Sequence, residues 1–225
     1  MRTTQGLFDL QVNGYAGVDF NDPRIDAVQL DYALAAMQRS GVTGCLPTVI
    51  TAHWHELEER FLALDRAVAD SQLGPLMVPG YHLEGPFLRD EKGYAGCHPM
   101  AAMTDPDAEK VLLLSKTLSR PILMTTLAPE RSGAFAAIKT LRENGVTVCI
   151  GHSAALYDDI ARAVGVGASC SPHLGNGLPQ TLHKLENTVL AQLAEPGLTA
   201  CFIADGHHIS PNALRALINL KGIEN

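Results

Sequence analysis

Short apolar runs alternate with longer amphipathic stretches along the whole chain, which is the pattern of strands alternating with helices. The apolar runs are nearly continuous, and this favours a parallel sheet covered by helices on its outer face. The predicted strands span residues 7–12, 44–50, 76–84, 121–128, 146–152, 168–173 and 198–206. The predicted helices span residues 26–40, 53–70, about 106–118, 131–144, 155–165, about 185–195 and 210–221.

Seven strand–helix units within 225 residues favour a (β/α)₈ barrel over an open, doubly wound sheet. An eighth strand is expected after the last helix, where the sequence ends in LKGIEN. No low-complexity segment, long linker or change in composition indicates a second domain. We therefore predict an α/β fold in which residues 1–225 form a single barrel domain that lacks its eighth strand.

Composition narrows the function classes. Hydrophobic residues make up 46% of the chain, enough for a sizeable core, and the net charge of -7 argues against a nucleic-acid-binding surface. The five cysteines lie far apart without a C-x-x-C pair, which is typical of a reducing compartment. Neither a signal peptide nor an apolar run of about 18 residues is visible. We expect a cytoplasmic protein that binds neither nucleic acid nor a membrane.

Unusual polar residues stand where predicted strands end, and the active site of a barrel is built from those ends. Glu84 in GYHLEGPFL, His152 in GHSAA and His173 in SPHLGNG are the chief examples, and Glu130 is another. Taken singly, Glu84 fits a solvated carboxylate and His152 a hydrogen-bonded buried histidine. Taken together, one carboxylate and two imidazoles can bind a divalent metal and leave a coordination position for water.

The metal site is expected to hold one ion. Many metal-dependent amidohydrolases carry an H-x-H pair on the first strand for a second ion, but this chain has Gln11 and Asn13 there, which are weaker ligands. Zinc suits the remaining ligands best, and iron or cobalt suit them nearly as well. The metal would polarise an amide carbonyl and lower the pKa of a bound water.

Further candidates lie near these ligands in sequence. His98 fits a group that polarises a substrate carbonyl, or an ordinary loop histidine. The glycine-rich loop at 173–177 can admit an anion, or is a plain turn. Lys184 offers a cation near that loop, or a solvated surface charge. Asp205 and His208 end the last predicted strand, and His208 is expected to face a substrate.

These segments together resemble the N-acetylglucosamine-6-phosphate deacetylases of the amidohydrolase superfamily. The matching segments run from Phe8 to Gly222 and are FDLQVNGYAGVDFND, HLEGPFL, the glycine-rich loop ending in His98, TLAPE, GHSAA, HLGNG and IADGHH. The resemblance implies a (β/α)₈ barrel, usually a homodimer, with one divalent metal. It implies hydrolysis of N-acetylglucosamine-6-phosphate, an amino sugar substrate, to glucosamine-6-phosphate and acetate.

The resemblance also implies roles for individual residues. Glu84, His152 and His173 correspond to the metal ligands, and His98 corresponds to the histidine that engages the scissile carbonyl. The expected substrate contacts are Gln11, Cys97, His98, Asn176, Gly177, Lys184, Asp205 and His208.

Three departures from the family pattern leave alternatives open. The small β-sandwich domain of the family is not visible in the sequence. Lys184 stands near the place of a phosphate-binding arginine, and lysine lacks the bidentate geometry of arginine. The aspartate of the eighth strand, the family's general base and acid, would lie beyond Asn225. The alternatives are hydrolysis of another amide or cyclic amide, and an inactive fragment that binds only metal or sugar.

Overall fold

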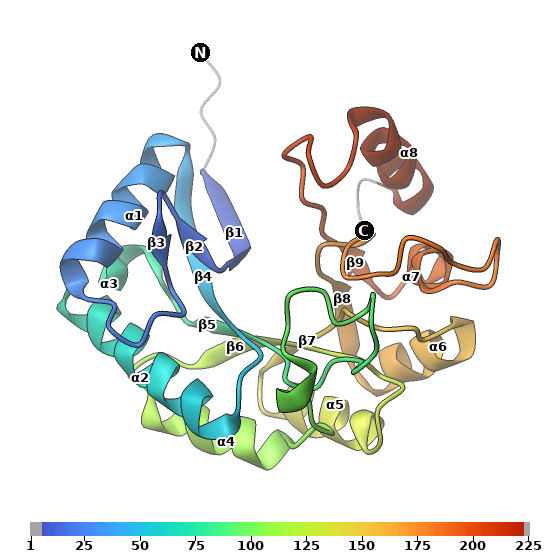
Figure 1. The fold of residues 1–225 in the computed structure, drawn as a ribbon, viewed down its shortest axis with the longest axis horizontal. Coiled ribbons are helices and arrows are strands. Elements are labelled where there is room, and N and C mark those ends of the chain that lie inside the picture. Colours follow the sequence, from blue (N-terminus) through green and yellow to red (C-terminus); the bar gives the residue numbers. More distant parts are fainter. Residues whose placement is uncertain (1–5, 223–225) are drawn as a thin grey trace. The chain divides into compact units, whose positions relative to one another are not determined.

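The computed structural model describes residues 6–222 as two compact units, of which the first contains residues 6–84 and 109–123 (Figure 1). In this unit β1 pairs with β4 and β4 with β5, each in parallel orientation. Its strands are β1 (Leu7–Val12), β2 (Gly14–Tyr15), β3 (Val18–Asp19), β4 (Val42–Ile50) and β5 (Tyr81–Glu84). Its helices are α1 (Ala27–Arg39), α2 (Trp54–Asp70), α3 (Gly74–Met77) and nearly all of α4 (Ala108–Thr117).

Helix α1 shows how local sequence sets the elements of this unit. The Asp26 carboxylate accepts the Gln29 N–H at 2.8 Å, and the Gln29 side chain accepts the Asp26 N–H at 3.2 Å. This capping box satisfies two N–H groups that the first turn leaves without partners. Leu30, Leu34 and Met37 then recur at helical spacing and are fully buried on the face that packs toward β4.

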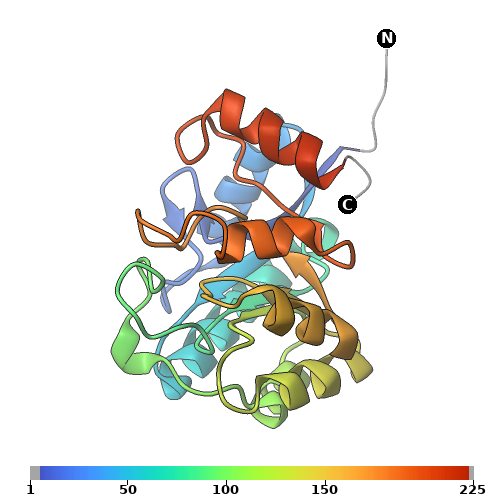
Figure 2. The ribbon, with the colours of Figure 1, turned by 90° about the vertical axis from the view of Figure 1, so that its right-hand side faces the viewer.

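The second unit contains residues 85–108 and 124–222. Its strands pair in parallel, β6 with β7, β7 with β8 and β8 with β9. They are most of β6 (Ile122–Leu127), β7 (Thr147–Ile150), β8 (Ala168–Ser171) and β9 (Thr199–Ala200). The helices are η1 (Met100–Ala102), α5 (Ala134–Glu143), α6 (Tyr157–Val166), α7 (Thr188–Ala194) and α8 (Pro211–Lys221). Helices α5, α6 and α7 lie next to one another in this order (Figure 2).

The order of strands identifies the fold class. The main sheet runs β1-β4-β5-β6-β7-β8-β9, so neighbouring strands follow one another along the chain. A doubly wound sheet reverses its strand order at a switch point, whereas a (β/α)₈ barrel keeps the chain order. The predicted fold class is therefore confirmed. The predicted lack of an eighth strand concerns the chain after Gly222, which lies outside the described residues, as does the start of the chain at 1–5.

Two predicted strands are shorter in the structure than in the prediction. Of the strand predicted at 76–84, residues 76 and 77 form the end of α3. The strand starts only at Tyr81, because Pro79 and Gly80 separate it from the helix. Within residues 198–206, only Thr199 and Ala200 pair with β8. The hairpin of β2 and β3 was not predicted, because two-residue strands carry no readable periodicity. No helix within residues 6–222 is both long and apolar enough to cross a membrane.

Asp65 is the buried polar centre of the first unit, and its loss should destabilise the fold. Its carboxylate accepts hydrogen bonds from the Tyr81 hydroxyl at 2.6 Å and from the Ser119 N–H and hydroxyl, each at 2.8 Å. Asp65→Ala leaves the buried Tyr81 hydroxyl without an acceptor and removes two hydrogen bonds to Ser119, and we expect the free energy of unfolding to fall by about 2–4 kcal/mol. Urea denaturation followed by circular dichroism measures the change.

The matched control is Glu59→Ala, an exposed position on the same helix. It should change the free energy of unfolding by less than about 0.5 kcal/mol. Equal effects of the two substitutions would contradict the assigned role of Asp65.

Candidate metal and substrate site

Glu84 is the last residue of β5 and is only 2% exposed. The Gln11 side chain on β1 donates from Nε2 to Glu84 Oε1 at 2.8 Å. Since a carboxylate only accepts, this contact assigns the amide nitrogen of Gln11 to the side facing Glu84. The opposite atom, Gln11 Oε1, is buried and has no hydrogen-bond partner among the described residues. A water or hydroxyl donor at this site would satisfy it.

His152 lies two residues after the end of β7 and is 6% exposed. Its Nδ1 atom is 2.6 Å from the main-chain oxygen of Tyr94. A carbonyl oxygen only accepts, so in the neutral ring Nδ1 carries the proton and Nε2 presents the lone pair. This is the arrangement that orients an imidazole as a metal ligand.

Two further imidazoles flank His152. The ring of His98 lies 4.5 Å from that of His152, and the ring of His173 lies 5.0 Å from it on the same measure of ring centroids. Both neighbours meet His152 edge to face and are at most 9% exposed. The second unit thus gathers three histidines, one from a loop and two from the ends of strands.

Both strand-end histidines have strained backbones. His152 has a φ of 50° and His173 a φ of 35°, and Ala16 is the one other non-glycine residue with positive φ among residues 6–222. The left-handed conformation costs a residue with a Cβ atom about 1–2 kcal/mol. Such strain concentrates at functional sites, where surrounding contacts hold the side chain in a required direction.

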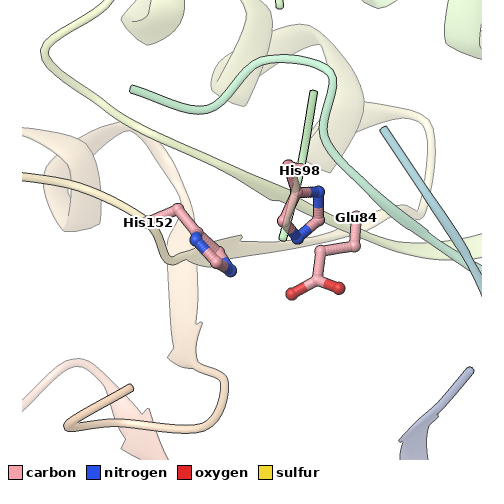
Figure 3. Close-up of side chains that lie close together, drawn as sticks. All are labelled: Glu84, His98 and His152. Carbon is pink, nitrogen blue, oxygen red and sulfur yellow. The ribbon is translucent and has the colours of Figure 1, made fainter. Parts of the chain in front are cut away.

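Glu84 is the residue directly before Gly85, where the segment that contains His98 begins. Glu84, His98 and His152 each offer one ligand atom, and these atoms lie within 4.8 Å of one another. Figure 3 shows the three side chains close together. A divalent metal can therefore be held here. The group contains His98, for which another role was predicted, whereas the predicted ligand His173 lies beside His152.

The other predicted substrate residues fall into two sets. Asn176 belongs to the turn after His173, since its main-chain and side-chain nitrogens both donate to the His173 oxygen, at 2.9 and 3.2 Å. Cys97 and Lys184 are exposed to solvent. These contacts place Asn176 near the histidines and leave the roles of Cys97 and Lys184 as predictions.

Asp205 and His208 form an exposed pair of their own. The Asp205 carboxylate accepts the main-chain N–H groups of His207 and His208 and lies 2.7 Å from His208 Nδ1. These hydrogen bonds, led by the one from the His208 main chain, hold the pKa of Asp205 well below its usual range. An ionised Asp205 fixes the orientation of the His208 ring, so that Nε2 of His208 points away from the pair.

The sequence did not reveal two contributions to the site. Tyr94 acts through its main-chain oxygen, for which the residue type carries no signal. Glu130 was noted at a strand end without a role, but its carboxylate accepts hydrogen bonds from Ser153 and Ala154, immediately after His152.

Gly177 packs directly against the His152 ring. A Cβ atom at this position would lie 2.6 Å from His152 Nδ1, and the φ of 64° favours glycine independently. Gly133 separates these effects, because its φ is 76° while nothing lies within 4 Å of the equivalent atom.

We expect Gly133→Ala to lower the free energy of unfolding by about 1 kcal/mol, through backbone strain alone. Gly177→Ala should lower it by a further 1–3 kcal/mol, approximately, since the methyl group displaces the His152 ring. Urea denaturation of both variants measures the difference, and equal losses would show that the ring contact is unimportant.

Comparison with known proteins gives no matching family model but clear relatives. The chain is 33% identical to N-acetylgalactosamine-6-phosphate deacetylase of Escherichia coli O157:H7, over 92% of this chain and 53% of the relative. It is 34% identical to N-acetylglucosamine-6-phosphate deacetylase of Danio rerio, over 93% of this chain and 53% of the relative. The chain therefore spans about half the length of the relatives it matches.

Solved structures agree with this comparison. The Mycobacterium smegmatis N-acetyl-D-glucosamine-6-phosphate deacetylase, solved in complex with N-acetyl-D-glucosamine-6-phosphate, matches with a TM-score of 0.83 at 29% identity. The match covers 96% of this chain and 55% of that structure. The resemblance predicted from the motifs is thus confirmed: over nearly its whole length, this chain is similar to about half of an N-acetylglucosamine-6-phosphate deacetylase.

Proposed function

We propose that this chain carries the metal site of an enzyme that hydrolyses the N-acetyl amide of an amino sugar 6-phosphate. The products are acetate and the free amino sugar 6-phosphate. The observation that carries the proposal is the similarity to such deacetylases over more than nine-tenths of the chain, together with the buried group of Glu84, His98 and His152.

The proposed ligands are Glu84, His152 and His173, with one divalent ion. The donor set of one carboxylate and two imidazoles suits zinc, and also iron or cobalt. The orphaned Oε1 of Gln11 supports a polar occupant at this site, since a buried acceptor needs a donor. When bound, the metal lowers the pKa of a coordinated water and polarises the amide carbonyl.

The side chains around the ligands have positioning and binding roles. Gln11 orients the Glu84 carboxylate through its 2.8 Å hydrogen bond, and the Tyr94 oxygen orients the His152 ring. To His98 we assign the donation of a hydrogen bond to the substrate carbonyl, where negative charge develops during attack by water.

The identity of the sugar is the finer part of the proposal. Relatives named for the gluco and for the galacto isomer match this chain equally well, at 34% and 33% identity. Lys184, the loop of Asn176 and Gly177, and the Asp205–His208 pair are the proposed contacts to phosphate and sugar. Hydrolysis of a different amide remains the alternative, to be separated by the substrate panel below. A homodimer in the cytoplasm is the assembly and location that we propose with this activity.

The first test is metal-dependent turnover by the full chain. With zinc or cobalt added, we expect acetate release from N-acetylglucosamine-6-phosphate or its galacto isomer, complete loss on chelation, and recovery on returning the metal. Because a phosphate-binding site rejects a sugar that leaves its cations unpaired, kcat/KM should fall by about 100-fold or more for the unphosphorylated sugar. Metal binding without any turnover would support the inactive-fragment alternative, and the absence of metal binding would refute the proposed site.

The second test distinguishes the ligands from their neighbour. His152→Ala and His173→Ala should each weaken cobalt affinity by more than about 100-fold, because loss of a ligand costs more than loss of an outer-shell partner. His98→Ala should change it by less than about 10-fold while abolishing turnover. Isothermal titration calorimetry measures the affinity, with the exposed His55→Ala as control. A larger effect of His98→Ala than of His173→Ala would assign the ligand role to the group in Figure 3 instead.

A further inference from the structure

We propose that Glu130 is a positioning residue that holds His152 in its metal-binding orientation. The proposal rests on the proposed role of His152 as a ligand. Glu130 lies in the TLAPE segment, three residues after the end of β6, and does not itself touch the imidazole cluster in any contact that the structure shows. Its action is on the main chain that follows His152.

Glu130 accepts hydrogen bonds from the two residues that follow His152, and the first of these also binds the third residue. Its Oε1 accepts the Ala154 N–H at 2.7 Å, and its Oε2 accepts the Ser153 hydroxyl at 2.6 Å. The Ser153 oxygen in turn accepts the Ala155 N–H at 3.0 Å. Ser153 is 1% exposed and the Glu130 side chain is 18% exposed, so the two bonds of Glu130 are partly buried and the bond between Ser153 and Ala155 is buried.

The hydrogen bonds of Glu130 lie next to a residue with a strained backbone. His152 has a φ of 50°, a conformation that residues with a Cβ atom avoid. Without neighbouring constraints the residue would rotate toward negative φ and its side chain would leave the position beside His98 and His173. Charge-assisted hydrogen bonds that the Glu130 carboxylate accepts from Ser153 and Ala154 are strong enough to oppose that rotation.

Arg89 contacts both Glu130 and the main-chain oxygen of His152. The Arg89 N–H donates to the His152 oxygen at 3.1 Å, and its guanidinium lies 3.6 Å from Glu130 Oε1. The same guanidinium lies 5.2 Å from the centre of the Tyr94 ring, whose main-chain oxygen binds His152 Nδ1. Backbone and ring of His152 are therefore held by one connected set of contacts, formed by Arg89, Tyr94 and Glu130.

Two simpler roles for Glu130 explain its contacts less well. As a surface ion pair with Arg89 it would use a 3.6 Å contact, longer than its hydrogen bonds at 2.6 and 2.7 Å. As a mere cap for α6 it would stabilise the helix entry without affecting the metal. Glu91 offers a matched comparison, since it also pairs with Arg89 but is 54% exposed and bonds to no residue after His152 in the contacts shown.

The experiment measures cobalt binding to the full chain in four variants. Glu130→Ala should weaken cobalt affinity by about 10- to 100-fold, as loss of an outer-shell partner does, and should alter the visible absorption spectrum of the bound ion. Glu130→Gln keeps an acceptor for the Ala154 N–H and should recover most of the affinity and the spectrum. Glu91→Ala should match the unaltered chain, and His152→Ala tests the ligand role itself.

The outcomes separate the two proposals. Loss of binding in His152→Ala with unchanged affinity and spectrum in Glu130→Ala would overturn the positioning role alone. Unchanged binding in His152→Ala would overturn the ligand role and this proposal with it. If Glu130→Ala does not fold, Ser153→Ala removes one of the two bonds and should still weaken binding and shift the spectrum. A lowered melting temperature of Glu130→Ala with a normal spectrum would make Glu130 a structural residue only.

Discussion

The candidate site depends on how the chain turns at the ends of β7 and β8. At each turn a histidine takes a left-handed backbone conformation, with φ of 50° at His152 and 35° at His173, and the two rings meet 5.0 Å apart. The apolar strands before them bury the backbone in a parallel sheet, so the direction of each ring is set by the first residues after the strand. The strain is local, and the contacts that oppose it come from other segments.

Those contacts come from parts of the second unit that are far apart in sequence. The Tyr94 oxygen accepts from the His152 ring, Arg89 bonds to its main-chain oxygen, and Glu130 holds the residues that follow. Gly177 leaves the space that the ring occupies. A histidine whose nitrogen is committed to a carbonyl presents its other nitrogen in one direction, and this preorganisation is what a metal site requires.

The Glu84 carboxylate is oriented by a different kind of contact. Glu84 sits at the end of a fully buried strand and receives a hydrogen bond from Gln11, the residue that replaces a histidine of the two-metal pattern. The Gln11 amide donates from Nε2 to the Glu84 carboxylate at 2.8 Å. This hydrogen bond orients the Glu84 carboxylate, which is one of the proposed metal ligands.

From the sequence alone the fold class could be predicted, together with a set of strand-end residues proposed for the site. Nearly continuous apolar runs separated by amphipathic helices can bury their faces only in a covered parallel sheet, and polar residues at strand ends then gather at one edge. Tertiary structure decided the rest. The first two residues of the strand predicted at 76–84 belong to helix α3, because local periodicity cannot separate short apolar segments. Three features depend on contacts between residues far apart in the sequence: the proximity of His98 to His152, the hydrogen bond of the Tyr94 carbonyl and the hydrogen bonds of Glu130. A partner that acts through its main chain cannot be recognised from its residue type.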